Sequence, residues 1–112
     1  MLKVSTVGDI TEVKFDNLQK LNILVSENIK AELQKLFDKT NAKVLINMDG
    51  VRFLDSSGFA AFLSVSKLAG RRDGQIIFCN VCNSAMDLFK VLQLHTVFRI
   101  IIDREEALHS FR

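Results

Sequence analysis

The chain has 112 residues, of which 48% are hydrophobic and 25% charged, so its size and composition indicate one globular domain and exclude an intrinsically disordered chain. Its 15 basic and 13 acidic residues leave a net charge of +2, and Trp and Tyr are absent, so it lacks the basic stripe and the best base-stacking side chains of a nucleic-acid-binding protein. No apolar run approaches the ~20 residues that cross a bilayer, and the N-terminus has no signal-peptide core. We therefore expect a cytoplasmic protein that enters no membrane. We expect a single domain over residues 1–112 that binds no nucleic acid directly.

The first third of the chain predicts two strands and a helix. Over residues 10–15 apolar side chains alternate with Glu12 and Lys14, which is the period of a half-buried strand. Residues 2–6 are expected to pair with this strand as an antiparallel edge, through a turn at Gly8-Asp9. From Ile23 to Asp38 the apolar residues recur with a helical period.

The rest of the chain alternates strands with helices. Continuous apolar runs predict buried strands at residues 43–48, 76–79 and 98–102, and helices are predicted at 57–70, 84–92 and 103–111. Residues 84–87 resemble a capping box, and Asp103 with Glu106 resembles a second helix start. This alternation predicts an α/β fold, with a mixed, mainly parallel sheet of four to five strands and about four helices.

The polar loop Asp55-Ser56-Ser57-Gly58 is the most informative segment, because it joins a buried strand to the start of a helix. Ligands and partners of α/β proteins bind at the carboxyl ends of strands. The free amides at a helix N-terminus favour an anion. A small hydroxyl at this junction therefore either caps the helix or receives a phosphate, and the local features alone favour the cap.

A family resemblance extends this interpretation. The stretch LINMDGVRFLDSSGFAAFL resembles the signature of anti-sigma factor antagonists of the STAS-domain family, in which an apolar strand and a loop lead to Asp-Ser-Ser/Ala-Gly and a helix. The similarity continues through IIFCNVCNSAMDLFKVLQLHTVFRII and covers about residues 10–108. In this family the serine after the Asp is phosphorylated by a partner anti-sigma factor that is a serine kinase. The resemblance implies phosphorylation of Ser56 and a partner-binding surface of Asn22, Asp55, Ser56, Ser57 and Gly58.

The function implied by the resemblance is that of a bacterial, non-enzymatic regulator of transcription. Such a protein binds its anti-sigma factor while Ser56 is unphosphorylated and is released by phosphorylation, and a serine phosphatase is a further partner. The resemblance implies no cofactor, no metal and no catalytic residue. An alternative within the family is an interaction module in a sensory assembly or a lipid-transport complex.

One position departs from the family pattern. Where the family usually has an Asp before its first helix, this chain has Asn22, and the glycine that precedes that Asp is missing. Asn caps a helix about as well as Asp, so the fold is expected to be unaffected. A negative charge beside Ser56 is lost, however, and this loss bears on the contacts with the partner.

Cys79 and Cys82 form a C-x-x-C sequence without the other features of a functional motif. As a zinc site it has half the usual ligands, and no helix begins at the first Cys to lower the pKa of its thiol. We therefore predict that Cys79 is a buried strand residue and Cys82 a loop residue, both reduced. His95 and His109 lie in no recognisable pattern and are expected on the surface.

The chain lacks the motifs of an enzyme and of a phosphoaccepting receiver domain. The chain has no G-x-S-x-G nucleophile elbow and no glycine-rich nucleotide motif, so we predict neither a serine hydrolase nor a nucleotide-dependent enzyme. Asp49 follows a buried strand, as the phosphoaccepting Asp of a receiver domain does. A receiver also needs an acidic pair after its first strand, where this chain has Asp16 and Asn17, so this class is disfavoured.

Overall fold

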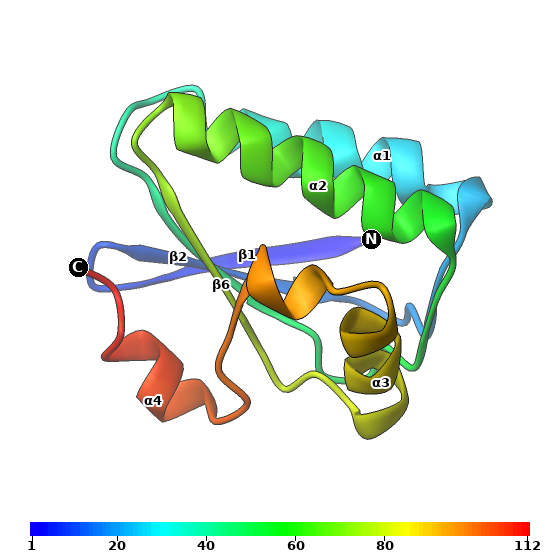
Figure 1. Ribbon diagram of the computed structural model, residues 1–112. Coiled ribbons are helices and arrows are strands. Elements are labelled where there is room, and N and C mark those ends of the chain that lie inside the picture. The colour runs from blue at the N-terminus through cyan, green and yellow to red at the C-terminus, as the bar shows by residue number, and fades with distance from the viewer.

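A five-stranded sheet forms the middle layer of the computed structural model, which describes residues 1–112 (Figure 1). In spatial order its strands are β1 (Leu2–Val7), β2 (Ile10–Phe15), β4 (Lys43–Asn47), β6 (Gln75–Cys79) and β7 (Arg99–Ile100). Strand β1 pairs antiparallel with β2, and the other neighbouring pairs are parallel. The structure confirms the mixed α/β sheet and the antiparallel edge that the sequence predicts.

Helices cover both faces of this sheet. The helices are α1 (Ile23–Lys35), α2 (Ser56–Arg71), α3 (Asn83–Val91) and α4 (Arg104–Leu108), and the short 3-10 helix η1 (Leu94–Thr96) follows α3. Figure 1 shows α1 and α2 side by side over one face, with α4 on the other. None of these helices combines the length and the apolar character that a membrane span requires.

Two apolar clusters lie on opposite faces of the sheet, because successive strand side chains point to opposite sides. In β4, Val44 and Ile46 enter the larger cluster beneath α1 and α2, whereas Leu45 enters the smaller one beneath α4. Phenylalanine rings pack edge-on in the larger cluster, for example Phe62 against Phe78 with centroids 5.1 Å apart. Each fully buried side chain of this size contributes about 1.5–3 kcal/mol of stability, so the central strands hold the layers together.

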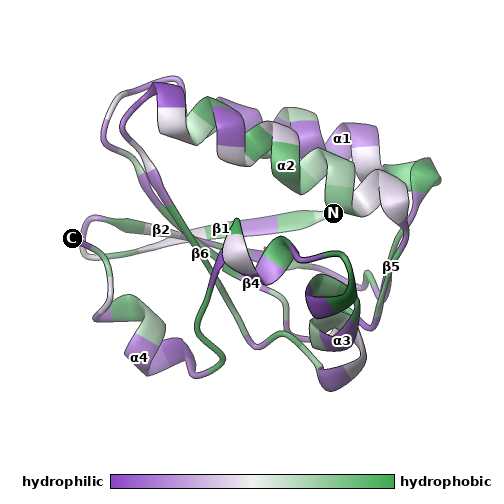
Figure 2. Ribbon diagram, viewed as in Figure 1, coloured by the Kyte–Doolittle hydropathy of each residue, from purple (hydrophilic) through white to green (hydrophobic).

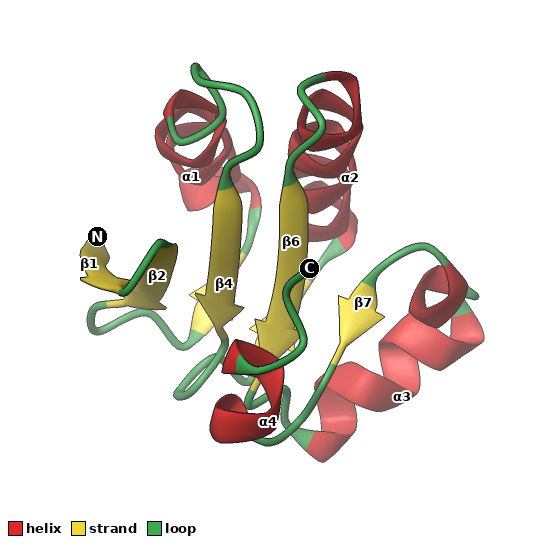
Figure 3. Cartoon of the chain, turned by 90° about the vertical axis from the view of Figure 1, so that its left-hand side faces the viewer, coloured by secondary structure: helices red, strands yellow, loops and turns green.

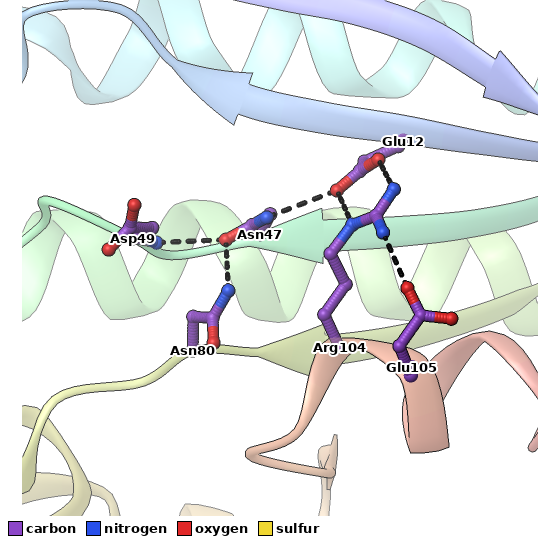
Figure 4. Close-up of polar contacts among 6 residues, drawn as sticks. All are labelled: Glu12, Asn47, Asp49, Asn80, Arg104 and Glu105. Carbon is purple, nitrogen blue, oxygen red and sulfur yellow. Dashed lines mark hydrogen bonds and ion pairs between the residues drawn. The ribbon is translucent and has the colours of Figure 1, made fainter.

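A buried ion pair ties α4 to the sheet (Figure 4). The side chain of Glu12 is only 1% exposed. Arg104 donates to its two carboxylate oxygens at 2.7 and 2.8 Å, and the amide of Asn47 donates at 3.0 Å. The hydrogen bonds from Arg104 are the largest cause that lowers the pKa of Glu12 to about 2, against the opposing effect of burial. The predicted alternation of β2 is correct, but the face that carries Glu12 is covered by α4.

Several element ends differ from the sequence prediction. Helix α4 ends at Leu108 and not near residue 111, and β7 is only Arg99–Ile100, shorter than the predicted 98–102. Helix α1 ends at Lys35 and not near Asp38, although Phe37 beyond it is still fully buried in the core. The predicted capping box at residues 84–87 is wrong: α3 begins one residue earlier, after Cys82, and the Ser84 hydroxyl donates to the carbonyl of Arg52 instead. The predicted cap at Asp103 is confirmed, since its carboxylate accepts a hydrogen bond from the Glu106 amide at 2.9 Å.

A second, two-stranded sheet was not predicted. It consists of β3 (Lys20–Leu21) and β5 (Phe53–Leu54), which run parallel. A strand of two residues is too short to show the alternation by which strands are recognised in a sequence. Each of these strands leads directly into a helix, β3 into α1 and β5 into α2, so this small sheet decides where the two helices begin.

Candidate functional site

Asn22 and Asp55 occupy equivalent places in the structure. Leu21 pairs with Leu54 in the two-stranded sheet, and the next residue of each strand is the N-cap of a helix. The Asn22 side chain accepts a hydrogen bond from the Leu24 amide at 3.0 Å, as the sequence predicts for an Asn cap. The amide of Asp55 donates to the Leu21 carbonyl at 3.2 Å. The N-termini of α1 and α2 are therefore held side by side.

The carboxylate of Asp55 caps α2. It accepts hydrogen bonds from the amides of Ser57 and Gly58 at 2.9 and 3.2 Å, and from the Ser57 hydroxyl. The Ser57 hydroxyl is the largest cause that lowers the pKa of Asp55 below its usual value, with smaller contributions from backbone amides that include that of Ile23 in α1. A negative charge is thus fixed between the two helix starts at neutral pH.

Ser56 and Ser57 differ in what their hydroxyl groups do. Ser56 is the first residue of α2, is exposed, and its hydroxyl makes no hydrogen bond within the chain. Ser57 is half-buried and its hydroxyl is bound to Asp55. The cap is therefore a carboxylate, and the interpretation of the serine hydroxyl as the cap of this helix is wrong. Of the two serines, only Ser56 presents a free hydroxyl to an approaching molecule.

Gly58 allows α2 to approach β3 closely. A Cβ atom at this position would lie 2.7 Å from the backbone carbonyl oxygen of Leu21, which is closer than real contacts allow. We expect Gly58→Ala to lower the free energy of unfolding by about 1–3 kcal/mol, the usual cost of overpacking, as measured by urea denaturation. The matched control is Gly70→Ala in the same helix, where a Cβ meets nothing within 4 Å. There we expect no loss or a gain of about 0.5–1 kcal/mol, and equal losses at both positions would contradict this account.

Exposed apolar side chains lie on the elements that adjoin the start of α2. They belong to the first turn of α1 and to β5: Ile23 is 73% exposed, Leu24 is 83% exposed and Phe53 is 57% exposed. The ammonium group of Lys20 lies 5.7 Å from the centre of the Phe53 ring. Figure 2 shows this first turn of α1 as hydrophobic. Sequence analysis missed these residues, because a helical apolar pattern does not tell which positions lack a covering neighbour. Exposed apolar side chains gathered in one place are typical of protein–protein contact surfaces.

The cysteines and histidines lie away from this arrangement. Cys79 is buried at the end of β6, and neither cysteine forms a disulfide. Cys82 is half-buried and lies in the loop between β6 and α3, as predicted, where it is the N-cap residue of α3. Burial acts to raise the pKa of its thiol, but hydrogen bonds from Ser84 and from the amides at the start of α3 outweigh it and lower that pKa. His95 and His109 are exposed, as predicted.

Comparisons with known proteins assign the family. Residues 3–107 match the model of the STAS domain. BtrV of Bordetella bronchiseptica, which is named as an anti-sigma factor antagonist, is 23% identical over 92 residues, which are 82% of this chain and 79% of BtrV. A STAS-domain anti-sigma-factor antagonist from Planctomyces limnophilus has a TM-score of 0.90 at 22% identity, covering 98% of this chain and 97% of the other. SpoIIAA of Bacillus in its phosphorylated form has a TM-score of 0.70 at 19% identity, covering 100% of both chains. Since the STAS model matches nearly the whole chain, the protein belongs to the STAS domain family.

Proposed function

We propose that this protein is an anti-sigma factor antagonist that works by partner switching. With Ser56 unmodified it binds an anti-sigma factor that is also a serine kinase, and phosphorylation of Ser56 by that kinase releases it. A serine phosphatase restores the binding form. The protein itself supplies the phosphoacceptor and the binding surface, and catalyses no step.

The free hydroxyl of Ser56 is the observation that carries this proposal. It is exposed at the first position of α2, whereas the neighbouring Ser57 hydroxyl is bound to the capping carboxylate of Asp55. A kinase reaches Ser56 without breaking a hydrogen bond of the fold. The resemblance in fold to SpoIIAA, which has been solved in a phosphorylated form, supports the same kind of modification here.

The surroundings of Ser56 suit a switch that acts on the partner and not on the fold. A phosphate at the N-terminus of α2 lies at the positive end of the helix dipole, which stabilises an anion by about 0.3–1 kcal/mol. The amides of Ser57 and Gly58 are already bonded to Asp55. The ionised Asp55 next to it opposes that gain, and Asn22 adds no further negative charge. The two effects on the free energy of folding largely cancel.

Phosphorylation of Ser56 has a larger effect on the free energy of binding to the partner. In the unmodified protein Ser56 presents a small hydroxyl at the start of α2, and the adjoining elements carry the exposed apolar side chains of Ile23, Leu24 and Phe53. A partner surface that packs on these side chains excludes water from the region around Ser56. A phosphoserine carries a charge of about −1.5 to −2 at pH 7, and burying such a charge without a partner costs far more than burying a hydroxyl.

Phosphorylation is expected at Ser56 and not at Ser57. After incubation with the cognate anti-sigma kinase and ATP, mass spectrometry of the digested protein is expected to place the phosphate on Ser56, because the Ser57 hydroxyl is held by Asp55. Ser56→Ala should abolish labelling, and Ser57→Ala serves as the matched control that retains it. Phosphate on Ser57, or undiminished labelling of Ser56→Ala, would refute the assignment. A chain that neither binds nor is modified by the kinase would favour a STAS interaction module outside sigma-factor control.

A further inference from the structure

Strand β1 is an open edge of the main sheet. Figure 3 shows it as the outermost strand, with no element beyond it. Five of its six residues are exposed, and the edge strand on the other side, β7, has only two residues. Proteins usually protect an edge with proline, a bulge, several charges or a covering segment. Strand β1 has no proline, pairs with β2 in an unbroken register, and carries a single charge on Lys3, which is paired with Asp16 at 3.5 Å.

The pairing with β2 decides which backbone groups of β1 are free. The Asp16 amide donates to the Met1 carbonyl at 2.9 Å, so residue 1 directs its polar groups toward β2. In an antiparallel ladder this direction alternates from one residue to the next. Lys3 and the other odd-numbered residues therefore bond inward, and the N–H and C=O groups that point outward are those of Leu2, Val4 and Thr6.

We propose that β1 pairs antiparallel with β1 of a second copy of this chain, so that the two main sheets become one continuous sheet. The twofold axis passes between the two Val4 residues. In this register Leu2 lies opposite Thr6 of the other copy, and all three outward-pointing residues find hydrogen-bond partners. Because paired residues in this register share a face of the sheet, α1 and α2 of both copies lie on the same side.

Side chains and charges fit this register. The two Val4 side chains, each 53% exposed in the single chain, meet at the axis. Lys3 lies opposite Ser5 of the other copy, so no like charges face each other, and the chain as a whole carries only +2. A shallow groove of about 350 Å³ between Met1 and α1 is lined by one acid and one base, Glu32 and Lys35. The two charged side chains of this groove are thus of opposite sign.

Sedimentation equilibrium tests the proposal on the intact protein. We expect a dimer that dissociates on dilution, and at least roughly tenfold weaker association in Val4→Lys, because two ammonium groups then meet at the axis. Val91→Lys is the matched control: it makes the same change at a position on α3 that is 76% exposed, and it should not alter the association. A protein that is monomeric at every concentration, or a dimer that Val4→Lys leaves unchanged, would overturn the proposal.

Hydrogen exchange provides a test that needs no variant. The amides of Leu2, Val4 and Thr6 are expected to become protected as the protein concentration rises, whereas those of Lys3 and Ser5, which already bond to β2, are expected to be protected at all concentrations. Self-association without added protection of the outward amides would place the contact on another surface. Exchange that does not depend on concentration at these three amides would likewise exclude β1 pairing.

Discussion

Ser56→Asp is expected to weaken binding to the anti-sigma factor by at least roughly tenfold, which corresponds to about 1.4 kcal/mol. The added carboxylate lies at the start of α2, and the exposed apolar side chains of Ile23, Leu24 and Phe53 lie on the adjoining elements. A partner bound to this surface excludes water, so desolvating an unpaired charge there opposes binding. Isothermal titration calorimetry with the purified partner measures the change in Kd. Asn28→Asp adds the same charge on an exposed position of α1 and is expected to leave the Kd within a few-fold.

The fold is expected to tolerate the same substitution. The N-terminus of α2 favours the new charge and the ionised Asp55 disfavours it, so the melting temperature should move by about 5 °C or less. Backbone amide shifts in the NMR spectrum should be confined to about residues 53–62 and to the adjoining start of α1. Unchanged affinity, or shifts spread through the main sheet, would show that the switch is absent or acts by a change of conformation.

Arg104→Met is expected to be among the most destabilising single substitutions in this chain. It leaves the carboxylate of Glu12, which is 1% exposed, without its ionic partner. Removing one member of a fully buried pair costs about 3–5 kcal/mol. Because the Arg104 side chain is 33% exposed, we expect a loss at or below the lower end of that range, still a large part of the roughly 5–15 kcal/mol that stabilises a typical domain. Urea denaturation at pH 7 measures the loss. Arg72→Met, at an exposed arginine outside any ion pair, is the control and should change the stability by less than about 0.5 kcal/mol.

The pH dependence of this loss identifies the charge of Glu12 as its cause. The pKa of Glu12 is about 2 in the folded protein, below its ordinary value of 4.5, so the ion pair stabilises the fold above about pH 4.5 and its contribution disappears as the pH falls toward 2. In Arg104→Met the buried carboxylate takes up a proton more readily, and its cost falls with pH. The difference in stability between the two proteins should therefore be largest near pH 7 and small near pH 2. A difference independent of pH would assign the effect to lost packing of the arginine side chain.

The main sheet was predictable because its strands carry strong local signals. The apolar run at Val44–Ile46 favours a strand that is buried on both faces, and polar and apolar residues alternate from Glu12 to Phe15 in β2. The burial of Glu12 was not predictable, since it depends on Arg104, which lies 92 residues further along the chain. A short helix at the end of the chain converts an apparently solvated face into a buried one.

The sequence indicated which residues form the candidate site, but not how the fold brings them together. The serine after Asp55 and the Asn22 cap follow from the motif and from capping preferences, whereas β3 and β5, which bring them together, are too short to be recognised. The sequence also did not show which of the two hydroxyl groups, that of Ser56 or that of Ser57, is free. Both are small hydroxyl residues at a helix start, and only the position of the Asp55 carboxylate shows which one it holds.

The two residue pairs of the two-stranded sheet differ in what they contact. Its inward pair, Leu21 and Leu54, is buried and anchors the starts of both helices, whereas its outward pair, Lys20 and Phe53, is exposed beside Ser56. Substitutions in the outward pair alter what a partner meets without creating a cavity in the core. Under the proposed function, recognition can therefore be altered at two positions while the scaffold that presents Ser56 stays the same.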